Sequence, residues 1–178
     1  MTVWVALLRA VNVSGVNSLP MGAFRDLLTG LGLADVRTYI QSGNAVFRSD
    51  LTGEVLRARI ADGVLAKFGF RPPVLMLSAD EIAAALAACS FGEQPGDKVH
   101  FFFTERALPR ATAEFLKSVA APSEEYAWRD KVLWLHLPEG IGRSKLARRV
   151  MGLPIDTTAR NLRSVRAIVA LTQKVGAA

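Results

Sequence analysis

Arginine and side-chain amides gather at two places in the first quarter of the chain. One group follows an initial apolar segment and contains Arg9, Asn12, Ser14 and Asn17; the other consists of Gln41, Ser42 and Asn44 around Gly43. Guanidinium and amide groups present N–H donors that suit an anion or a planar polar ligand. Turn formation is the competing explanation, since Asn, Ser and Gly dominate turns for backbone reasons. Turn propensity explains Arg9 least.

A third polar group lies near residue 144, where the glycines at 140 and 142 precede Arg143, Ser144 and Lys145. Ser144 is a typical N-cap, so a helix is expected to begin here. Backbone N–H groups at a helix start, flanked by two cations, are suited to bind an anion. Many helices begin with similar residues, so this motif is weak by itself.

The final helix is expected to run from about Thr158 to Lys174. At 100° per residue, one arc is apolar and is formed by Leu162, Val165, Ile168, Val169 and Thr172. Arg160, Arg163 and Lys174 fall on the opposite, solvent-facing arc. Asn161 falls on the apolar side, where an amide needs hydrogen-bond partners. We therefore expect Asn161 to brace a neighbouring loop or to line a pocket.

The positive charge is concentrated near the end of the chain. The 178 residues carry a formal net charge of +6, yet residues 1–138 hold 14 basic and 14 acidic side chains. Residues 139–178 hold eight Lys or Arg and two Asp or Glu. A local basic patch attracts polyanions such as nucleic acids. A solvated helix face is the alternative explanation.

Apolar periodicity predicts an alternation of strands and helices in the first 78 residues. Strands are expected at 3–8, 36–40, 45–47 and 74–77, and helices at about 20–32 and 55–69. The order strand, helix, strand, strand, helix, strand is that of the split βαβ, or ferredoxin-like, unit. Ser78 and Glu81 form a capping box that begins a further helix, 80–89, and a linker covers 91–97.

A similar cycle of elements follows in residues 98–178. Strands are expected at 99–104, 126–128 and 132–137, and helices after Pro109, at 144–151 and in the final segment. We therefore predict an α+β protein with two tandem ferredoxin-like subdomains, at 1–78 and 98–178, joined by a capping helix and linker at 79–97. The second subdomain is expected to be incomplete or varied.

Several classes of protein are excluded by composition. The chain has one cysteine and two histidines, so neither a disulfide framework nor a metal site is expected, and no nucleotide-binding glycine motif points to a cofactor. Each histidine lies in an apolar strand, and Cys89 lies among alanines as a small hydrophobe. No apolar run approaches the ~20 residues of a membrane span. These features favour a cytoplasmic protein that binds no membrane, and they do not indicate an oligomeric state.

Four segments resemble the bacterial domain of unknown function 1697 family. They are Ala6–Gly15 (ALLRAVNVSG), Tyr39–Phe47 (YIQSGNAVF), Pro138–Leu146 (PEGIGRSKL) and Thr157–Asn161 (TTARN). Two positions depart from the family pattern: Ala10 stands where Gly is usual, and Leu162 where Trp is frequent. The resemblance implies an α+β fold with tandem ferredoxin-like subdomains and no established activity. It also marks as motif positions the ten candidate ligand-binding residues Arg9, Asn12, Gln41, Ser42, Asn44, Arg143, Ser144, Lys145, Arg160 and Asn161.

Three functions remain open at this point. The first is binding of a phosphate-bearing ligand, either a nucleotide or a nucleic acid, at the polar Arg/Asn/Gln/Ser site. The second is an enzyme that acts on a small polar substrate in a cleft between the subdomains. It lacks an obvious general base, because Glu139 is the only carboxylate within the clusters. The third is a structural interaction module.

Overall fold

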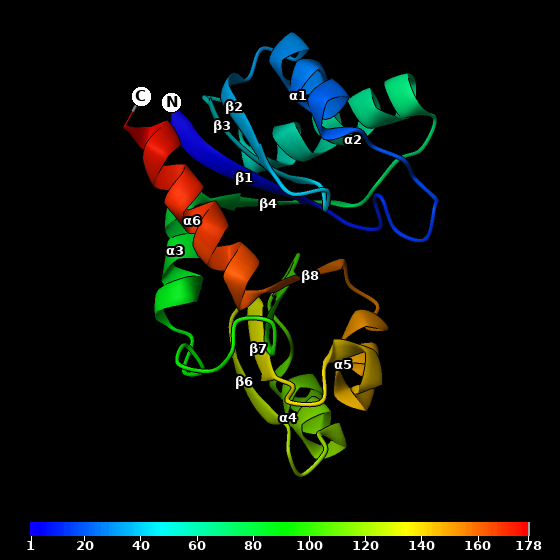
Figure 1. Ribbon diagram of the computed structural model, residues 1–178, viewed down its shortest axis with the longest axis vertical. Coiled ribbons are helices and arrows are strands. Elements are labelled where there is room, and N and C mark those ends of the chain that lie inside the picture. Colours follow the sequence, from blue (N-terminus) through cyan, green and yellow to red (C-terminus); the bar gives the residue numbers. More distant parts are fainter. Residues whose placement is uncertain (178) are drawn as a thin grey trace. The chain divides into compact units, whose positions relative to one another are not determined.

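The computed structural model describes residues 1–177, and within them the chain divides into two units (Figure 1). Unit 1 consists of Met1–Ala83 together with the segment from Ala167 onward, and unit 2 is Ala84–Arg166. Each unit contains one four-stranded antiparallel sheet. The protein therefore has a mixed α+β fold, as predicted.

Unit 1 contains four strands in the order β2-β3-β1-β4. The strands are β1 (Thr2–Leu8), β2 (Ala34–Tyr39), β3 (Asn44–Ser49) and β4 (Val74–Ser78). The helices α1 (Met21–Gly30) and α2 (Gly53–Phe68) lie between them in sequence, and α3 (Ala79–Ala87) begins directly after β4. All six elements expected in the first 78 residues are present.

Strand β1 is buried on both faces, which explains its continuous apolar sequence. On one face, Ala6 and Leu8 pack with α1 and α2 in a core that also contains Phe24, Phe47 and Ile60. On the other face, Val5 and Leu7 are also fully buried. The C-terminal end of α6 (Leu162–Gly176) runs beside β1 (Figure 1), where Gly176 lies against Val3.

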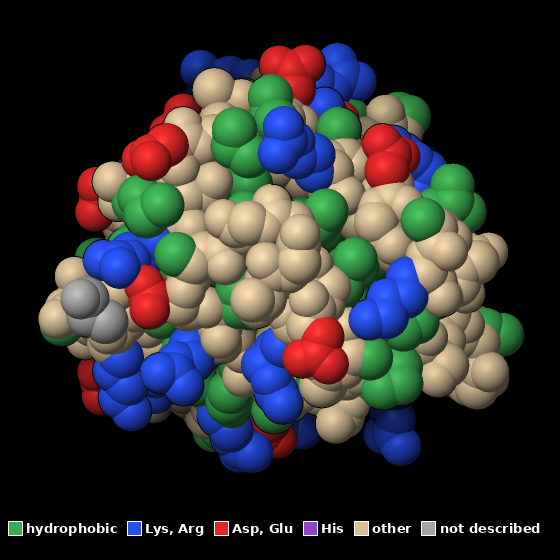
Figure 2. Space-filling view, turned by 90° about the horizontal axis from the view of Figure 1, so that it is seen from above, with side chains coloured by type: hydrophobic (Ala, Val, Ile, Leu, Met, Phe, Trp, Pro, Cys, Tyr) green, Lys and Arg blue, Asp and Glu red, His purple; other side chains and the backbone are tan. Residues whose placement is uncertain are grey.

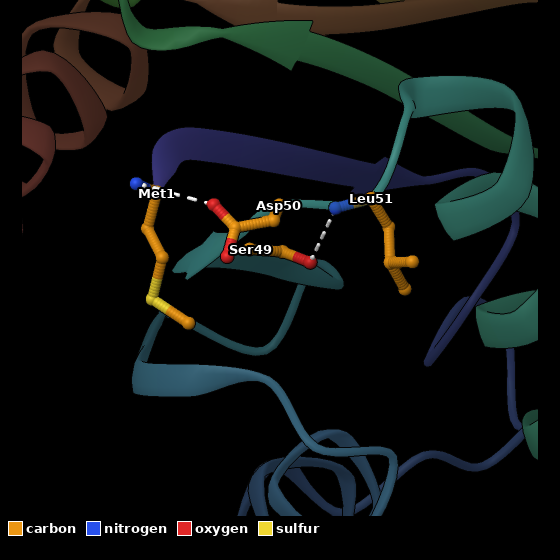
Figure 3. Close-up of polar contacts among 4 residues, drawn as sticks. All are labelled: Met1, Ser49, Asp50 and Leu51. Carbon is orange, nitrogen blue, oxygen red and sulfur yellow. Dashed lines mark hydrogen bonds and ion pairs between the residues drawn. The ribbon is translucent and has the colours of Figure 1, made fainter.

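Local polar contacts set the ends of the elements in unit 1. The Met1 ammonium lies 3.2 Å from Asp50 Oδ1, and Ser49 Oγ accepts a hydrogen bond from the Leu51 amide before α2 (Figure 3). The capping box before α3 is confirmed, because the Ser78 amide donates to Glu81 Oε2 at 2.7 Å and the Glu81 amide donates to Ser78 Oγ at 3.1 Å.

Unit 2 contains four strands in the order β6-β7-β5-β8. They are β5 (Val99–Thr104), β6 (Glu125–Arg129), β7 (Val132–His136) and β8 (Thr157–Asn161). Between them come α4 (Arg110–Val119), the short 3₁₀ helix η1 (Ile141–Arg143) and α5 (Lys145–Met151). One face of this sheet packs with α4 and α5 in a core that includes Phe102, Leu133, Leu135, Leu116 and Leu146.

The helix predicted from Thr158 is wrong in its first turn. Residues 157–161 form β8, which pairs antiparallel with β5, and α6 begins at Leu162. The β-branched Thr157 and Thr158 favour a strand. Pairing with the fully buried β5 satisfies backbone N–H and C=O groups, and the apolar periodicity of a helix contains no information about such pairing. Unit 2 therefore has four strands, and α5 between β7 and β8 has seven residues.

The helices within residues 1–177 include none that is long and apolar enough to cross a membrane.

Candidate functional site

Five of the ten candidate residues belong to unit 1 and five to unit 2. In unit 1, the structure brings together the loop after β1 and the turn between β2 and β3. The Leu8 amide donates a hydrogen bond to the Gly43 carbonyl at 2.9 Å, which joins the two segments at their bases.

Asn12 holds the loop after β1 in place through its side chain. Its Nδ2 donates to the carbonyl oxygens of Leu19 and Gln41, each at 2.9 Å, and its Oδ1 accepts from the Leu19 amide at 2.7 Å. Each of these bonds is to backbone, so both ends of the amide are already used. Asn12 therefore acts as a brace rather than as a free ligand contact.

The backbone of this loop is strained. Ala10, Asn12, Ser14 and Asn17 have φ between 52° and 57°, and Ile40 in the adjoining turn has φ of 47°. Residues other than glycine rarely adopt such angles, and each costs about 1–3 kcal/mol. Ala10 has φ of 57°, a left-handed conformation that glycine adopts without steric cost.

Gly43 and Asn44 also have structural roles in the turn. Gly43 has φ of 70°, and a Cβ on it would lie 2.6 Å from Val11 Cγ2 and 2.8 Å from Leu8 Cβ. Asn44 is fully buried, and its Nδ2 donates to the Tyr39 carbonyl at 3.1 Å. Turn chemistry thus accounts for these two residues, as the competing explanation predicted.

Arg9 is the least committed polar side chain of this region. Its amide donates to the Pro73 carbonyl at 3.0 Å, which continues the pairing of β1 with β4. The side chain is partly buried, and its guanidinium forms no hydrogen bond or ion pair within residues 1–177. Arg9 and the exposed Gln41 side chain remain as candidate ligand contacts here, and Ser42 is a candidate that already has an interaction within the protein.

The predicted N-cap at the start of α5 is confirmed in unit 2. Ser144 is buried, and its Oγ accepts a hydrogen bond from the Ala147 amide at 3.0 Å. Lys145, Arg148 and Arg149 are exposed on α5, at spacings of three and four that place them on one face of the helix. Arg143 lies just before them, and its guanidinium is 3.9 Å from the exposed carboxylate of Glu139.

An exposed aromatic ring lies beside this basic face. Phe115 on α4 is 48% exposed, and the Arg149 guanidinium lies over its ring, 5.1 Å from the centroid. Sequence periodicity places Phe115 among the apolar residues of its helix, so the exposure of its ring was not predicted. Its position next to Leu116 could have indicated this exposure, because two consecutive residues cannot both lie at the centre of a buried helix face.

Arg160 and Asn161 lie on β8 rather than on a helix. Arg160 faces Phe101 across the strand pair, and burial lowers the pKa of its guanidinium to about 10. Asn161 Oδ1 accepts a hydrogen bond from the Ser164 amide at 2.9 Å, so Asn161 caps the start of α6. The expectations that Arg160 lies on a solvent-facing helical arc and Asn161 on an apolar one are therefore wrong.

The two histidines and the cysteine of unit 2 are buried or partly buried. His100 in β5 is 7% exposed, and burial lowers its pKa. His136 Nδ1 lies 2.8 Å from Glu125 Oε1. Cys89 is partly buried, and burial raises the pKa of its thiol, which makes it a weak nucleophile at neutral pH. Residues 1–177 contain no group of three or more His, Cys, Asp or Glu placed to hold a metal ion.

Comparison with known proteins agrees with this fold. Residues 1–134 match the family described as "Protein of unknown function (DUF1697)". The chain belongs to the DUF1697 family. A solved structure, that of the conserved bacterial protein SP0830 from Streptococcus pneumoniae, is similar to this DUF1697 chain with a TM-score of 0.78 and 22% identity, over 96% of this chain and 98% of that one. At that identity the likeness shows the fold alone. Among curated proteins, none matches the sequence.

Proposed function

We propose that this DUF1697 protein binds a phosphate-bearing ligand, either a nucleotide or a nucleic acid. One observation carries the proposal: Lys145, Arg148 and Arg149 share an exposed face of α5, and α5 contains no acidic residue. Like charges at these spacings repel one another, and a bound polyanion would relieve the repulsion.

The residues around α5 favour a ligand with phosphate groups over a smaller, less charged ligand. Arg143 adds a fourth exposed cation, and its contact with Glu139 is long and exposed to solvent, so it holds the guanidinium weakly. Guanidinium groups bind phosphate oxygens in bidentate fashion. Phe115 offers a surface on which a base can stack beside Arg149.

The polar residues of unit 1 are proposed as a separate contact region. Arg9, Gln41 and Ser42 would contact an anionic ligand in unit 1 itself, while Asn12 and Asn44 keep the two loops in shape. In unit 2, Ser144 and Asn161 have the same supporting role, since each caps a helix. Arg160 is included because burial disfavours its charged form and lowers its pKa, and a bound anion would offset this cost.

The subdomain architecture and the cellular location of the protein belong to the same proposal. Both sheets have the strand order and antiparallel pairing of a split βαβ unit, which supports two ferredoxin-like subdomains with boundaries at 1–78, 79–97 and 98–178. The single, partly buried thiol supports a cytoplasmic location, where thiols remain reduced.

The decisive experiment measures binding of a fluorescently labelled oligonucleotide, and of ATP, to the full chain. The test variant replaces Arg143, Lys145, Arg148 and Arg149 by Ala. A matched control replaces four exposed cations elsewhere, Arg59, Arg106, Arg129 and Lys174, and so removes the same charge. We expect the test variant to lose at least about tenfold in affinity, which corresponds to about 1.4 kcal/mol.

The control variant distinguishes the effect of where the cations lie from the effect of the protein's net charge. On the face drawn in Figure 2, Lys and Arg side chains are interspersed with acidic and apolar ones. Exposed basic side chains also occur outside α5, Arg59 and Lys174 among them. Equal losses of affinity in the two variants would show that binding depends only on net charge. Absence of binding by the wild-type chain at low salt would also contradict the proposal.

A further inference from the structure

Unit 2 contains an open hollow of about 510 Å³ at the C-terminal end of α4. Three alanines, Ala120, Ala121 and Ala127, line it, and their small side chains leave the space open. The volume is within the range of small-molecule sites, about 300–1,000 Å³. None of the ten candidate residues contributes to the hollow, so it is distinct from the basic face of α5.

The charges around the hollow favour a cation. Glu124 and Glu125 line it from the start of β6, and it lies at the end of α4, where helix carbonyls carry partial negative charge. Lys117 is the one basic residue among the lining side chains, and it is exposed on the last turn of α4. The residues that line the hollow therefore carry more negative than positive charge, although the protein as a whole is positive.

An aromatic ring adds a second element of cation recognition. Phe91 lines the hollow, and its ring lies 6.2 Å from that of His136, which pairs with Glu125 across the β6–β7 ladder, so Phe91 and Glu125 lie on the same face of β6. Tyr126 also lines the hollow, but it follows Glu125 in the strand and therefore points to the opposite face, where its ring stacks at 5.8 Å on that of Trp128. The faces of aromatic rings attract organic cations, with contributions of about 0.5–2 kcal/mol.

The two carboxylates are fixed before any ligand arrives. Glu124 Oε2 accepts a hydrogen bond from the Ala121 amide at 2.8 Å, which closes the turn after α4. Glu125 Oε1 lies 2.8 Å from His136 Nδ1. Each carboxylate has a second oxygen available, and a fixed acceptor loses less entropy on binding than a mobile one.

We propose that this hollow binds a small organic cation that carries a primary ammonium group. The ammonium would donate to Glu125, and the attached carbon chain would lie on the ring of Phe91. This inference is independent of the proposed phosphate site and of any nucleic-acid ligand.

The test is a titration of the isotopically labelled full chain, followed by NMR, with n-butylammonium and with n-butyrate. The two probes have the same carbon chain and opposite charge. We expect butylammonium to cause saturable shifts of the amides of Phe91, Tyr126 and Ala127, and butyrate to leave them unchanged. Equal shifts with both probes, or shifts from butylammonium that do not exceed those of distant surface amides, would overturn the proposal.

Variants identify the groups that bind. Glu125→Gln keeps the size of the side chain and an oxygen partner for His136, and we expect it to weaken binding at least about fivefold through loss of a charged acceptor. Phe91→Leu keeps an apolar side chain without a ring and should also weaken binding. The control Glu114→Gln, on α4 but outside the hollow, should bind as the wild type does. An unchanged affinity in both Glu125→Gln and Phe91→Leu would contradict the assignment.

Discussion

The side-chain Nδ2 of Asn12 lies 2.9 Å from the backbone carbonyl oxygen of Gln41 and donates a hydrogen bond to it. This bond joins two loops that are 29 residues apart in sequence, and the same amide also fixes the Leu19 backbone at both its N–H and its C=O. Replacing Asn12 by Ala should lower the free energy of unfolding by about 1–3 kcal/mol, because three backbone groups lose their partner.

Chemical denaturation measures this loss, and Asn17→Ala is the matched control. Asn17 has a similar φ but makes one exposed side-chain bond, to the Ala10 carbonyl, so its replacement should be milder. A loss for Asn12→Ala no greater than that for Asn17→Ala would show that the bridge to Gln41 contributes nothing to stability.

Gly43→Ala tests the close approach of the turn to β1. The added Cβ would lie 2.6 Å from Val11 Cγ2, and the residue would have to keep φ of 70°. We expect destabilisation of about 1–3 kcal/mol from steric overlap and strain. Gly30→Ala is the control, since it sits at the end of α1 with no atom within 4 Å of the new Cβ. In a thermal unfolding assay, Gly30→Ala should leave the melting temperature unchanged or raise it. Equal melting temperatures for Gly43→Ala and Gly30→Ala would contradict the close packing of Gly43 against β1.

Asn161→Ala tests the cap of α6. Loss of the acceptor for the Ser164 amide should cost about 0.5–2 kcal/mol, whereas Asn161→Asp keeps an acceptor at the helix start and should stay close to wild type. Replacing the exposed Arg163 by Ala should change stability by less than about 0.5 kcal/mol. Urea denaturation of the three variants distinguishes them. Similar losses for Asn161→Ala and Asn161→Asp would rule out capping as the role of this side chain.

His100 makes the stability of the protein depend on pH. Burial lowers the pKa of His100 below its ordinary value of 6.5, and its Nδ1 has no hydrogen-bond partner within residues 1–177. The neutral form is therefore favoured by folding. This contribution is complete above about pH 6.5, where the unfolded chain is also neutral, and is lost as the pH falls through the lower pKa of the folded state.

Unfolding measured between pH 7.5 and pH 5 in wild type and in His100→Gln checks this expectation. The wild type should lose more stability over this range than the variant, which has no ionisable group at position 100. Parallel pH dependence in the two proteins would show that His100 does not titrate differently on folding.

Salt dependence provides a further test of the proposed phosphate contacts. Each phosphate contact contributes about 0.7 to 0.9 to the slope of log affinity against log salt concentration, because bound counterions are released. Arg148→Ala should therefore reduce the slope for an oligonucleotide by about one such contact, while Arg59→Ala should not change it. Identical slopes for both variants and the wild type would place the contacts away from α5.

Much of the fold follows from local sequence. The apolar run at 3–8, the helical periodicity of α1 and α2, and the capping box at Ser78 and Glu81 each predict an element that the structure contains. These signals are reliable because strand alternation, helix period and end-capping depend on neighbouring residues alone. The N-cap at Ser144 was predictable for the same reason.

The sequence by itself could not decide the segment 157–161. The apolar residues of α6 follow a helical period from Leu162 onward, and this period by itself does not mark the residue at which the helix begins. Pairing with β5, more than fifty residues earlier in the chain, makes residues 157–161 a strand instead. A distant strand that needs a partner outweighs local propensity, because unpaired buried backbone groups cost more than a less favoured conformation.

Tertiary structure also decided which polar residues are free. Sequence grouped Arg9, Asn12 and Asn44 as similar candidates, whereas folding uses both amides for backbone bonds and leaves the Arg9 guanidinium without a partner in residues 1–177. The hollow at the end of α4 is a further example. Its alanines, carboxylates and rings come from separate segments, and only chain folding brings them to one place, because contacts between distant residues leave no periodic signal in the sequence.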